Sequence, residues 1–188
     1  GDYIISLMPD DGCTLSFGNG SSSYCVMGST GNNGRVYCNM LQEVYIGKNV
    51  TFTNSSAFYN CYSLASITIP DSVRSIGDSA LRGLYSLASI TIPDGVTSIG
   101  ASVFNDCYSL ASITIPDGVT SIAAYAFSGC YGMRYYDFSA CTAIPALSNT
   151  SAFNGIPSDC QMLIPSALYN NWKSATNWAT YASKMVSV

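Results

Sequence analysis

The stretch CYSLASITIPDSVRSIGDSALRGL, residues 61–84, decides the fold because near-copies of it follow directly. LYSLASITIPDGVTSIG covers residues 84–100, and CYSLASITIPDGVTSIA covers residues 107–123. Equivalent residues are 23 positions apart, and residues at the same place in successive repeats form a column. One such column extends to both sides of these copies: Leu41, Leu64, Leu87, Leu110 and Met133. A fixed period of about 20–50 residues is typical of a solenoid, in which each repeat forms one coil and stacks on the next.

Each repeat predicts the same succession of short elements. In SITIP, isoleucines alternate with Ser66 and Thr68, which is typical of a half-buried strand that the following proline ends. Pro-Asp-Gly or Pro-Asp-Ser then favours a tight turn. VTSIG predicts a second, short and irregular extended segment. The apolar spacing in DSALRG, residues 78–83, predicts a single helical turn that closes the coil.

One column predicts where that helical turn stops. The residues directly before the cysteine column are Asn60, Gly83, Asp106 and Gly129. Asn, Asp and Gly are the residues that most readily adopt the left-handed backbone conformation with which helices end. We therefore expect positive φ angles at all four positions.

The cysteines divide into two groups. Four of the eight share one column, where leucine stands at a fifth place: Cys38, Cys61, Leu84, Cys107 and Cys130. Because leucine fits there and stacked side chains point the same way, we expect buried, reduced and inert thiols in this column. Cys13, Cys25, Cys141 and Cys160 lie outside it, and a Cys13–Cys25 bridge is an alternative for the first two. Without histidine or CxxC spacing, we expect no zinc site.

The pattern LxSITIPDxVTSIGxxAFxxCxxL over residues 41–132 resembles the BspA-like leucine-rich repeat family. We predict an α/β repeat solenoid, a right-handed leucine-rich-repeat superhelix. One parallel sheet, short second strands and single helical turns would make up its coils. An N-terminal hairpin cap and a C-terminal helical cap would close its two ends.

Three segments follow from this architecture, all within one structural domain. Residues 1–40 form an N-terminal cap or hairpin region, built from TLSF and YCVM, or else a remnant of a preceding domain. Residues 41–158 hold the BspA-like repeats. Residues 159–188 provide a last strand, MLIP, and a capping helix that Ser166 begins as N-cap. Trp172 and Trp178 would cover the exposed end strand, with sugar binding as the alternative.

Composition excludes several classes of function. Only 10% of residues are charged and the net charge is −4, so the basic patch that nucleic-acid binding needs is missing. No apolar run reaches the length of a membrane span. Ser-His-Asp and Cys-His triads need a histidine, and the sequence has none. Asp71, Asp94 and Asp117 recur as turn residues, so we expect no enzyme and no cofactor.

Two rows of side chains are candidate ligand-binding surfaces, because stacking places equivalent residues side by side. The first row is one edge of tyrosines, which suit interfaces: Tyr62, Tyr85, Tyr108 and Tyr131. The second is a hydroxyl-rich ribbon on the sheet, with Tyr45, Tyr135 and Asp137 at its ends: Ser66, Thr68, Ser89, Thr91, Ser112 and Thr114. Alternatively, the tyrosine rings only stack and shield the leucine column, and the hydroxyls only solubilise the strands.

The resemblance implies a function that the residues alone do not define. Members of the family are bacterial cell-surface proteins that bind extracellular-matrix and plasma proteins such as fibronectin and fibrinogen. We therefore expect an extracellular, non-catalytic binding module, adhesin-like or glycan-recognising, whose signal peptide or upstream region has been removed. Its partner would be a host or neighbouring surface protein, or a glycan. The alternative is a structural spacer or assembly domain of a larger bacterial surface or phage-tail-like protein.

Overall fold

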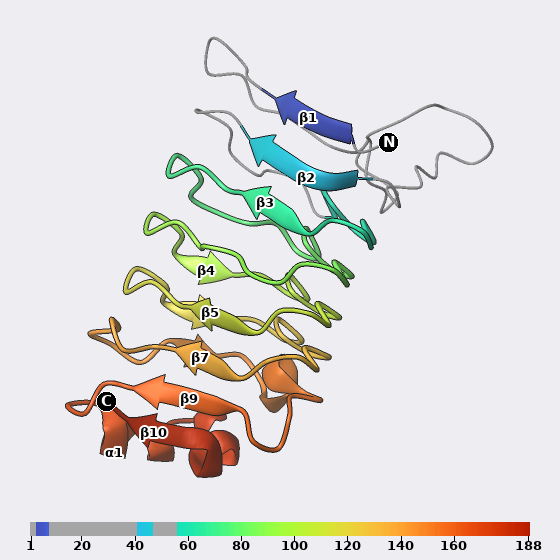
Figure 1. Ribbon diagram of the computed structural model, residues 1–188. Helices are drawn as coiled ribbons and strands as arrows, with labels where there is room; N and C mark the ends of the chain where they lie inside the picture. Colours follow the sequence, from blue (N-terminus) through green and yellow to red (C-terminus); the bar gives the residue numbers. More distant parts are fainter. Residues whose placement is uncertain (1–2, 8–40, 47–55) are drawn as a thin grey trace.

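The computed structural model describes residues 3–7, 41–46 and 56–188, which form a stack of coils (Figure 1). Most coils contribute one strand to the same side of the stack, and all paired neighbours on that side are parallel. These strands are β1 (Tyr3–Leu7), β2 (Leu41–Ile46), β3 (Ser66–Thr68), β5 (Ser112–Thr114), β7 (Tyr135–Asp137), β9 (Gln161–Ile164) and β10 (Met185–Ser187). The repeat period and the stacking of coils are thus confirmed.

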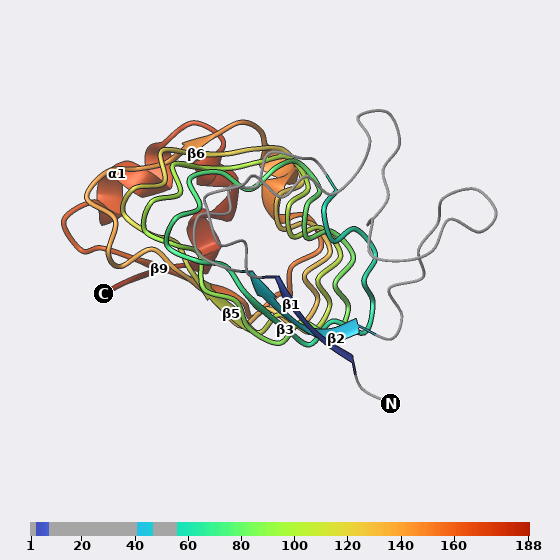
Figure 2. The same cartoon turned by 90° about the horizontal axis from the view of Figure 1, so that it is seen from above.

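The described coils surround a common interior, as the view along the stack shows (Figure 2), and the buried apolar side chains form one cluster there. Leu64, Leu87 and Leu110 are completely buried. They belong to one continuous apolar cluster that extends from Val44 to Met185. Within β3 the burial pattern is exposed, buried, exposed, as the alternation in SITIP predicts. Side chains of neighbouring coils therefore cover one another, and no coil has a core of its own.

The second extended segments form a sheet of their own on another side of the coils. Its strands are β4 (Ser98–Ile99), β6 (Ser121–Ile122) and β8 (Ala146–Leu147). Ile99 pairs in register with Ile122, Ile122 with Leu147, and Ile76 bridges to Ile99. The predicted short second strands are confirmed.

The prediction of one continuous parallel sheet is wrong at a single coil. Strands β1–β2–β3 form one sheet and β5–β7–β9–β10 another. The segment between them, residues 89–91, has the same SIT sequence as β3 and β5. From Ser89 to Ile92 its backbone makes no hydrogen bond to the described part of the chain. The hydrogen bond that Ala111 N donates to Ala88 O, at 3.3 Å, is the last before this opening.

The predicted helical turns are also wrong for most coils, for a reason that the stack itself provides. Alternate N–H groups donate to carbonyls of the next coil, for example Phe104 N to Ala126 O and Asp106 N to Ser128 O, both at 2.8 Å. An N–H used between coils cannot bond to the carbonyl four residues earlier, as an α-helix requires. Among the described coils only the last of these segments is helical, as the 3₁₀-helix η2 (Thr150–Phe153).

The left-handed column is confirmed. The φ angles are +60° at Asn60, +74° at Gly83, +62° at Asp106 and +76° at Gly129. A second left-handed column, which the sequence analysis missed, contains Ser56, Ser79, Ser102 and Tyr125. Serine and tyrosine carry little preference for this conformation, so only the fixed contacts between coils hold them there.

Gly129→Ala is expected to lower the free energy of unfolding by about 1–2 kcal/mol, because a β-carbon is disfavoured at positive φ. The added carbon would also lie 2.5 Å from Asp106 Oδ1, which must move away. Urea unfolding followed by circular dichroism measures the change. Gly132→Ala would not be a fair control, because its added carbon would meet the Tyr108 carbonyl at 2.5 Å. Ser102→Gly is the useful counterpart, and it should leave stability unchanged or raise it.

The C-terminal segment differs from the single helix predicted. It contains α1 (Tyr169–Ser174) and the 3₁₀-helix η3 (Trp178–Lys184), separated at Asn177, whose φ is +65°. Leu168, not Ser166, is the N-cap of α1, and no side chain caps this helix. The chain then returns as β10 to extend the sheet beside β9, a strand that the sequence analysis missed.

Both tryptophans of this segment are buried. Trp172 is completely inaccessible and Trp178 is 1% exposed, which excludes the alternative that they bind sugar in this conformation. Their rings pack against Phe138, and Trp178 also packs against Phe153.

The predicted N-terminal hairpin of TLSF and YCVM falls on residues outside the described ones, and so do Cys13, Cys25 and Cys38. Within them, β1 pairs with β2 in parallel, which the sequence analysis did not predict. The domain boundaries, the two caps and the hand of the superhelix stay predictions.

Candidate functional site

The tyrosine row, Tyr62, Tyr85, Tyr108 and Tyr131, is a continuous stack of rings along one edge of the solenoid. Ring centroids are 4.5 Å apart between Tyr62 and Tyr85, 4.4 Å between Tyr85 and Tyr108, and 5.3 Å between Tyr108 and Tyr131. The interplanar angles are 30°, 15° and 24°. Because each tyrosine follows the cysteine column by one residue, the stacking of coils alone brings the rings together.

Exposure increases along this row toward the C-terminal end. Tyr62 and Tyr85 are half-buried, whereas Tyr108 is 38% and Tyr131 is 62% exposed. Burial, followed by the neighbouring tyrosines, raises the pKa of Tyr62 and of Tyr85. Rings that cover one another leave edges and hydroxyls for a partner, and Tyr131 at the end of the row offers the largest free surface.

The hydroxyl-rich ribbon also forms in the register that the sequence predicts. Thr68, Thr91 and Thr114 are exposed. Tyr135 lies opposite Ser112 and Asp137 opposite Thr114, and Tyr135 is 41% exposed. On the other sheet, Tyr45 pairs with Thr68. The opening at residues 89–92 divides this ribbon between two sheets, so it is not the single uninterrupted surface that was expected.

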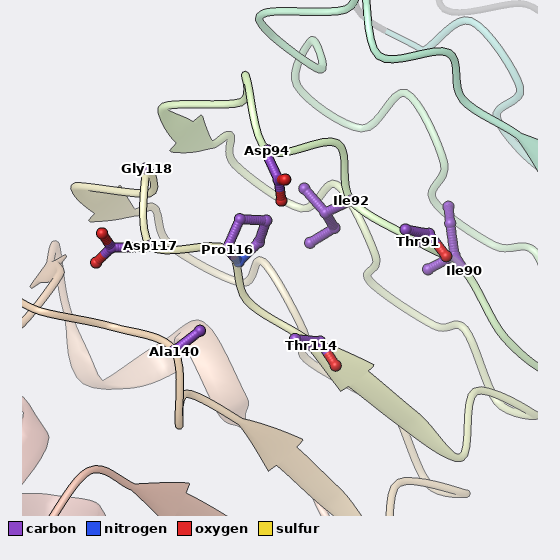
Figure 3. A pocket seen from close by; sticks show the side chains of 9 residues that line it. All are labelled: Ile90, Thr91, Ile92, Asp94, Thr114, Pro116, Asp117, Gly118 and Ala140. Carbon is purple, nitrogen blue, oxygen red and sulfur yellow. The ribbon is translucent and has the colours of Figure 1, made fainter.

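A hollow of about 530 Å³ lies at that opening and was not predicted (Figure 3). Thr91 and Thr114 line it, so two of the predicted candidates meet there. The remaining lining residues are Ile90, Ile92, Asp94, Pro116, Asp117, Gly118 and Ala140. The identical SIT segments gave no signal for the opening, since the same letters form strands in the coils on either side.

The repeated aspartates keep the turn role that the sequence predicts, most clearly at Asp117. Its Oδ1 accepts hydrogen bonds from Thr142 N at 2.6 Å and from Thr142 Oγ1 at 2.8 Å. These bonds favour the carboxylate and lower the pKa of Asp117. Asp117 therefore ties the turn of one coil to the next and keeps its negative charge at the rim of the hollow.

The cysteine column is buried, as predicted. Cys61, Cys107 and Cys130 have no exposed surface. The thiol of Cys107 donates to Leu81 O at 3.3 Å, and that of Cys130 donates to Phe104 O at 3.2 Å. Burial raises the pKa of Cys107 to about 12 and raises that of Cys130 as well. Thiols that stay protonated and covered are poor nucleophiles.

The remaining chemistry of the described residues is sparse. They include no group of three or more cysteine, aspartate or glutamate side chains placed to hold a metal ion. Among residues 3–7, 41–46 and 56–188, no helix combines the length and apolar character needed to cross a membrane. What the described residues offer is surface: a ring stack and a hydroxyl ribbon that follow from the repeat, and a hollow where the strand pairing is interrupted.

Stacked coils with a leucine column and parallel strands define a leucine-rich-repeat protein. The sequence model described as "BspA type Leucine rich repeat region" matches residues 33–134 in six copies. The chain belongs to this family. No curated protein matches the chain.

Solved structures of similar proteins share the fold. A leucine-rich cell surface protein from Faecalibacterium prausnitzii A2-165 is 34% identical, with a TM-score of 0.57 over 65% of this chain and 31% of its own. A leucine-rich repeat protein from Bacteroides ovatus ATCC 8483 is 26% identical, with a TM-score of 0.51 over 72% of this chain and 48% of its own. The present chain thus spans about a third and about half of these two relatives.

A third structure, the leucine-rich repeat protein of T. pallidum, has a TM-score of 0.50 and 20% identity. It covers 96% of this chain and 86% of its own. At this identity the likeness shows the fold alone.

Proposed function

We propose that this chain is a non-catalytic binding module of an extracellular cell-surface protein, and that it holds its partner through the tyrosine row. The similarity to a protein described as a leucine-rich cell surface protein supports the location. The residues point to binding rather than catalysis, because the conspicuous side chains occur as repeated rows and no histidine is present. The partner expected for such a module is a host or neighbouring surface protein, or a glycan.

The observation that carries this proposal is the exposed end of the tyrosine row. Tyr131 is 62% exposed while its ring is held by Tyr108 at 5.3 Å. A ring that is fixed before binding loses little conformational entropy when a partner covers it, and tyrosine is enriched among residues that dominate binding energy. The stack therefore provides a large contact area that is already ordered.

The double variant Tyr108→Ser/Tyr131→Ser is expected to weaken binding about tenfold or more, since both rings would be central contacts. The measurement is binding to immobilised fibronectin and fibrinogen and to a glycan array. Tyr125→Ser is the matched control: Tyr125 is 50% exposed and stands in the column of Ser56, Ser79 and Ser102, so serine fits there. Equal binding by all three proteins would remove the tyrosine row from consideration.

A second candidate function is a structural spacer that assembles end to end. The observation favouring it is β10, which pairs on one side with β9 and exposes Val186 at 37%, and Val188, directly after the strand, is 52% exposed. An edge strand with exposed apolar residues is suited to pairing with another chain. Light scattering on the same purified samples separates the two functions, because a spacer would form larger species with growing concentration and a binding module would not.

A further inference from the structure

We infer that the hollow on the sheet face is a second binding site, which receives a lysine or arginine side chain from an extended segment of a partner protein. This inference adds a site to the proposed binding function and does not use the tyrosine row. The hollow lies where the pairing of strands along the stack is interrupted. The coils before and after it form strands from the same SIT sequence, yet residues 89–91 join neither sheet.

The opening leaves backbone groups without partners at the wall of the hollow. N–H and C=O groups of Ser89–Ile92 make no hydrogen bond to the described chain, although Ile92 is only 3% exposed. Polar backbone groups at a largely buried position cost free energy unless water or a ligand satisfies them. Together with the hydroxyls of Thr91 and Thr114, they offer donors and acceptors to the backbone of a bound peptide.

The size and lining of the hollow fit a long side chain. About 530 Å³ lies within the range of about 300–1,000 Å³ that is common for ligand sites. Apolar residues make up part of the lining: Ile90, Ile92, Pro116 and Ala140. Lysine and arginine carry an apolar stem of methylene groups below a charged head, so their stems can contact apolar lining while the head reaches a carboxylate.

The carboxylates at the rim of the hollow favour a ligand of positive charge. Asp94 lies beside Ile92, and Asp117 lies on the other side of Pro116 (Figure 3). In the described part of the chain the only ion pair joins Arg82 to Asp106, so neither carboxylate has a cationic partner within 4.0 Å among the described residues. An ammonium or guanidinium group would supply one, and charge-assisted hydrogen bonds to carboxylates are among the stronger contacts.

Arg74, whose guanidinium lies close to Gly95, does not take this place. Arg74 donates from Nη1 to Asp71 O and Val73 O, which holds its guanidinium at the turn of its own coil, beside Gly95. The turn of the next coil comes so close that a β-carbon on Gly118 would lie 2.9 Å from Asp94 O. The two carboxylates are therefore carried by turns that are packed together and fixed before a ligand arrives.

The test is binding of a fluorescently labelled tetralysine peptide, measured by anisotropy, with tetraglutamine as the neutral comparison. Asp94→Asn is expected to weaken tetralysine binding about two- to fivefold, the effect of losing one exposed ion pair. Asp71→Asn is the matched control, because it removes one charge from the same column but does not line the hollow. Asp71→Asn should leave the affinity for tetralysine unchanged. Tetraglutamine should bind neither the unmodified chain nor the variants.

Three outcomes would overturn the inference. Equal weakening by Asp94→Asn and Asp71→Asn would mean that the peptide senses only the overall negative charge. Tetralysine binding no tighter than tetraglutamine would remove the charge argument. Calcium that binds with Asp94-dependence and displaces the peptide would mark a metal site instead. Asp117→Asn is the second variant if Asp94→Asn does not fold. Because Asp117→Asn also disturbs the turn contact with Thr142, Thr142→Val is its control.

Two variants distinguish binding in the hollow from binding through the tyrosine row. The Tyr108→Ser/Tyr131→Ser variant should bind tetralysine as well as the unmodified chain does. Asp94→Asn should still bind the partner of the tyrosine row. Backbone amide chemical shifts of Thr91 and Ile92 should move when tetralysine is added, because their N–H groups lack partners. Shifts confined to Tyr108 and Tyr131 would place the peptide on the other site and contradict this one.

Discussion

Replacing Trp178 by alanine is expected to lower the free energy of unfolding by about 3–5 kcal/mol, the usual cost of deleting a buried aromatic side chain. The indole is 1% exposed and packs between Phe138 and Trp172, with centroids at 5.4 Å from each. Its Nε1 donates to Pro145 O at 2.7 Å. Because it joins the C-terminal helices to the last coils, its loss would open that end of the core. Urea unfolding followed by circular dichroism measures the change.

A comparison of two phenylalanine variants separates packing from hydrogen bonding. Trp178→Phe keeps an aromatic ring but removes the donor to Pro145 O, leaving a buried carbonyl without this partner. Trp172→Phe deletes similar volume, but Trp172 Nε1 has no partner within the described residues. Trp178→Phe should therefore cost about 1–3 kcal/mol more than Trp172→Phe. Equal costs would show that the Pro145 contact contributes nothing.

The sequence predicts those parts of the fold that depend on one coil and its copies. Ile67 and Ile69 alternate with exposed hydroxyls, and the left-handed residues Asn60 and Gly83 stand in one column, so their conformations follow from local chemistry. The helical turns fail because Phe104 N and Asp106 N bond to the next coil. Competition between hydrogen bonds within and between coils is decided by stacking geometry, which no single repeat encodes.

The candidate site divides in the same way. The tyrosine stack follows from period and register, so it was predictable residue by residue. The hollow was not, because Ser89, Ile90 and Thr91 are identical in type to residues that form β3 and β5. Nor was β10, since MVS carries too few residues for a pattern. Where equal sequences adopt different pairing, only the accumulated geometry of the whole stack can distinguish them.

Raising the pH from 9 to 12 is expected to destabilise the fold by about 4 kcal/mol through Cys107 alone. Burial raises the pKa of this thiol from 9.0 to about 12, and each unit corresponds to about 1.4 kcal/mol. The sign follows from the proton. In the unfolded chain the thiol ionises near pH 9, whereas in the fold it stays protonated until about pH 12. The contribution of this thiol to the free energy of unfolding is thus fully present below pH 9, and it declines as the pH rises from 9 to 12.

Cys130 and Tyr136 add to the same decline, because burial raises the pKa of both. Cys107→Ala should make stability fall less steeply between pH 9 and 12, since one of the buried acids with a raised pKa is then gone. Val103→Ala is the control: Val103 is equally buried and cannot ionise, so its variant should lose stability by the same amount at every pH. Urea midpoints measured across the pH range test both. An unchanged slope in Cys107→Ala would mean that water reaches this thiol in the folded state.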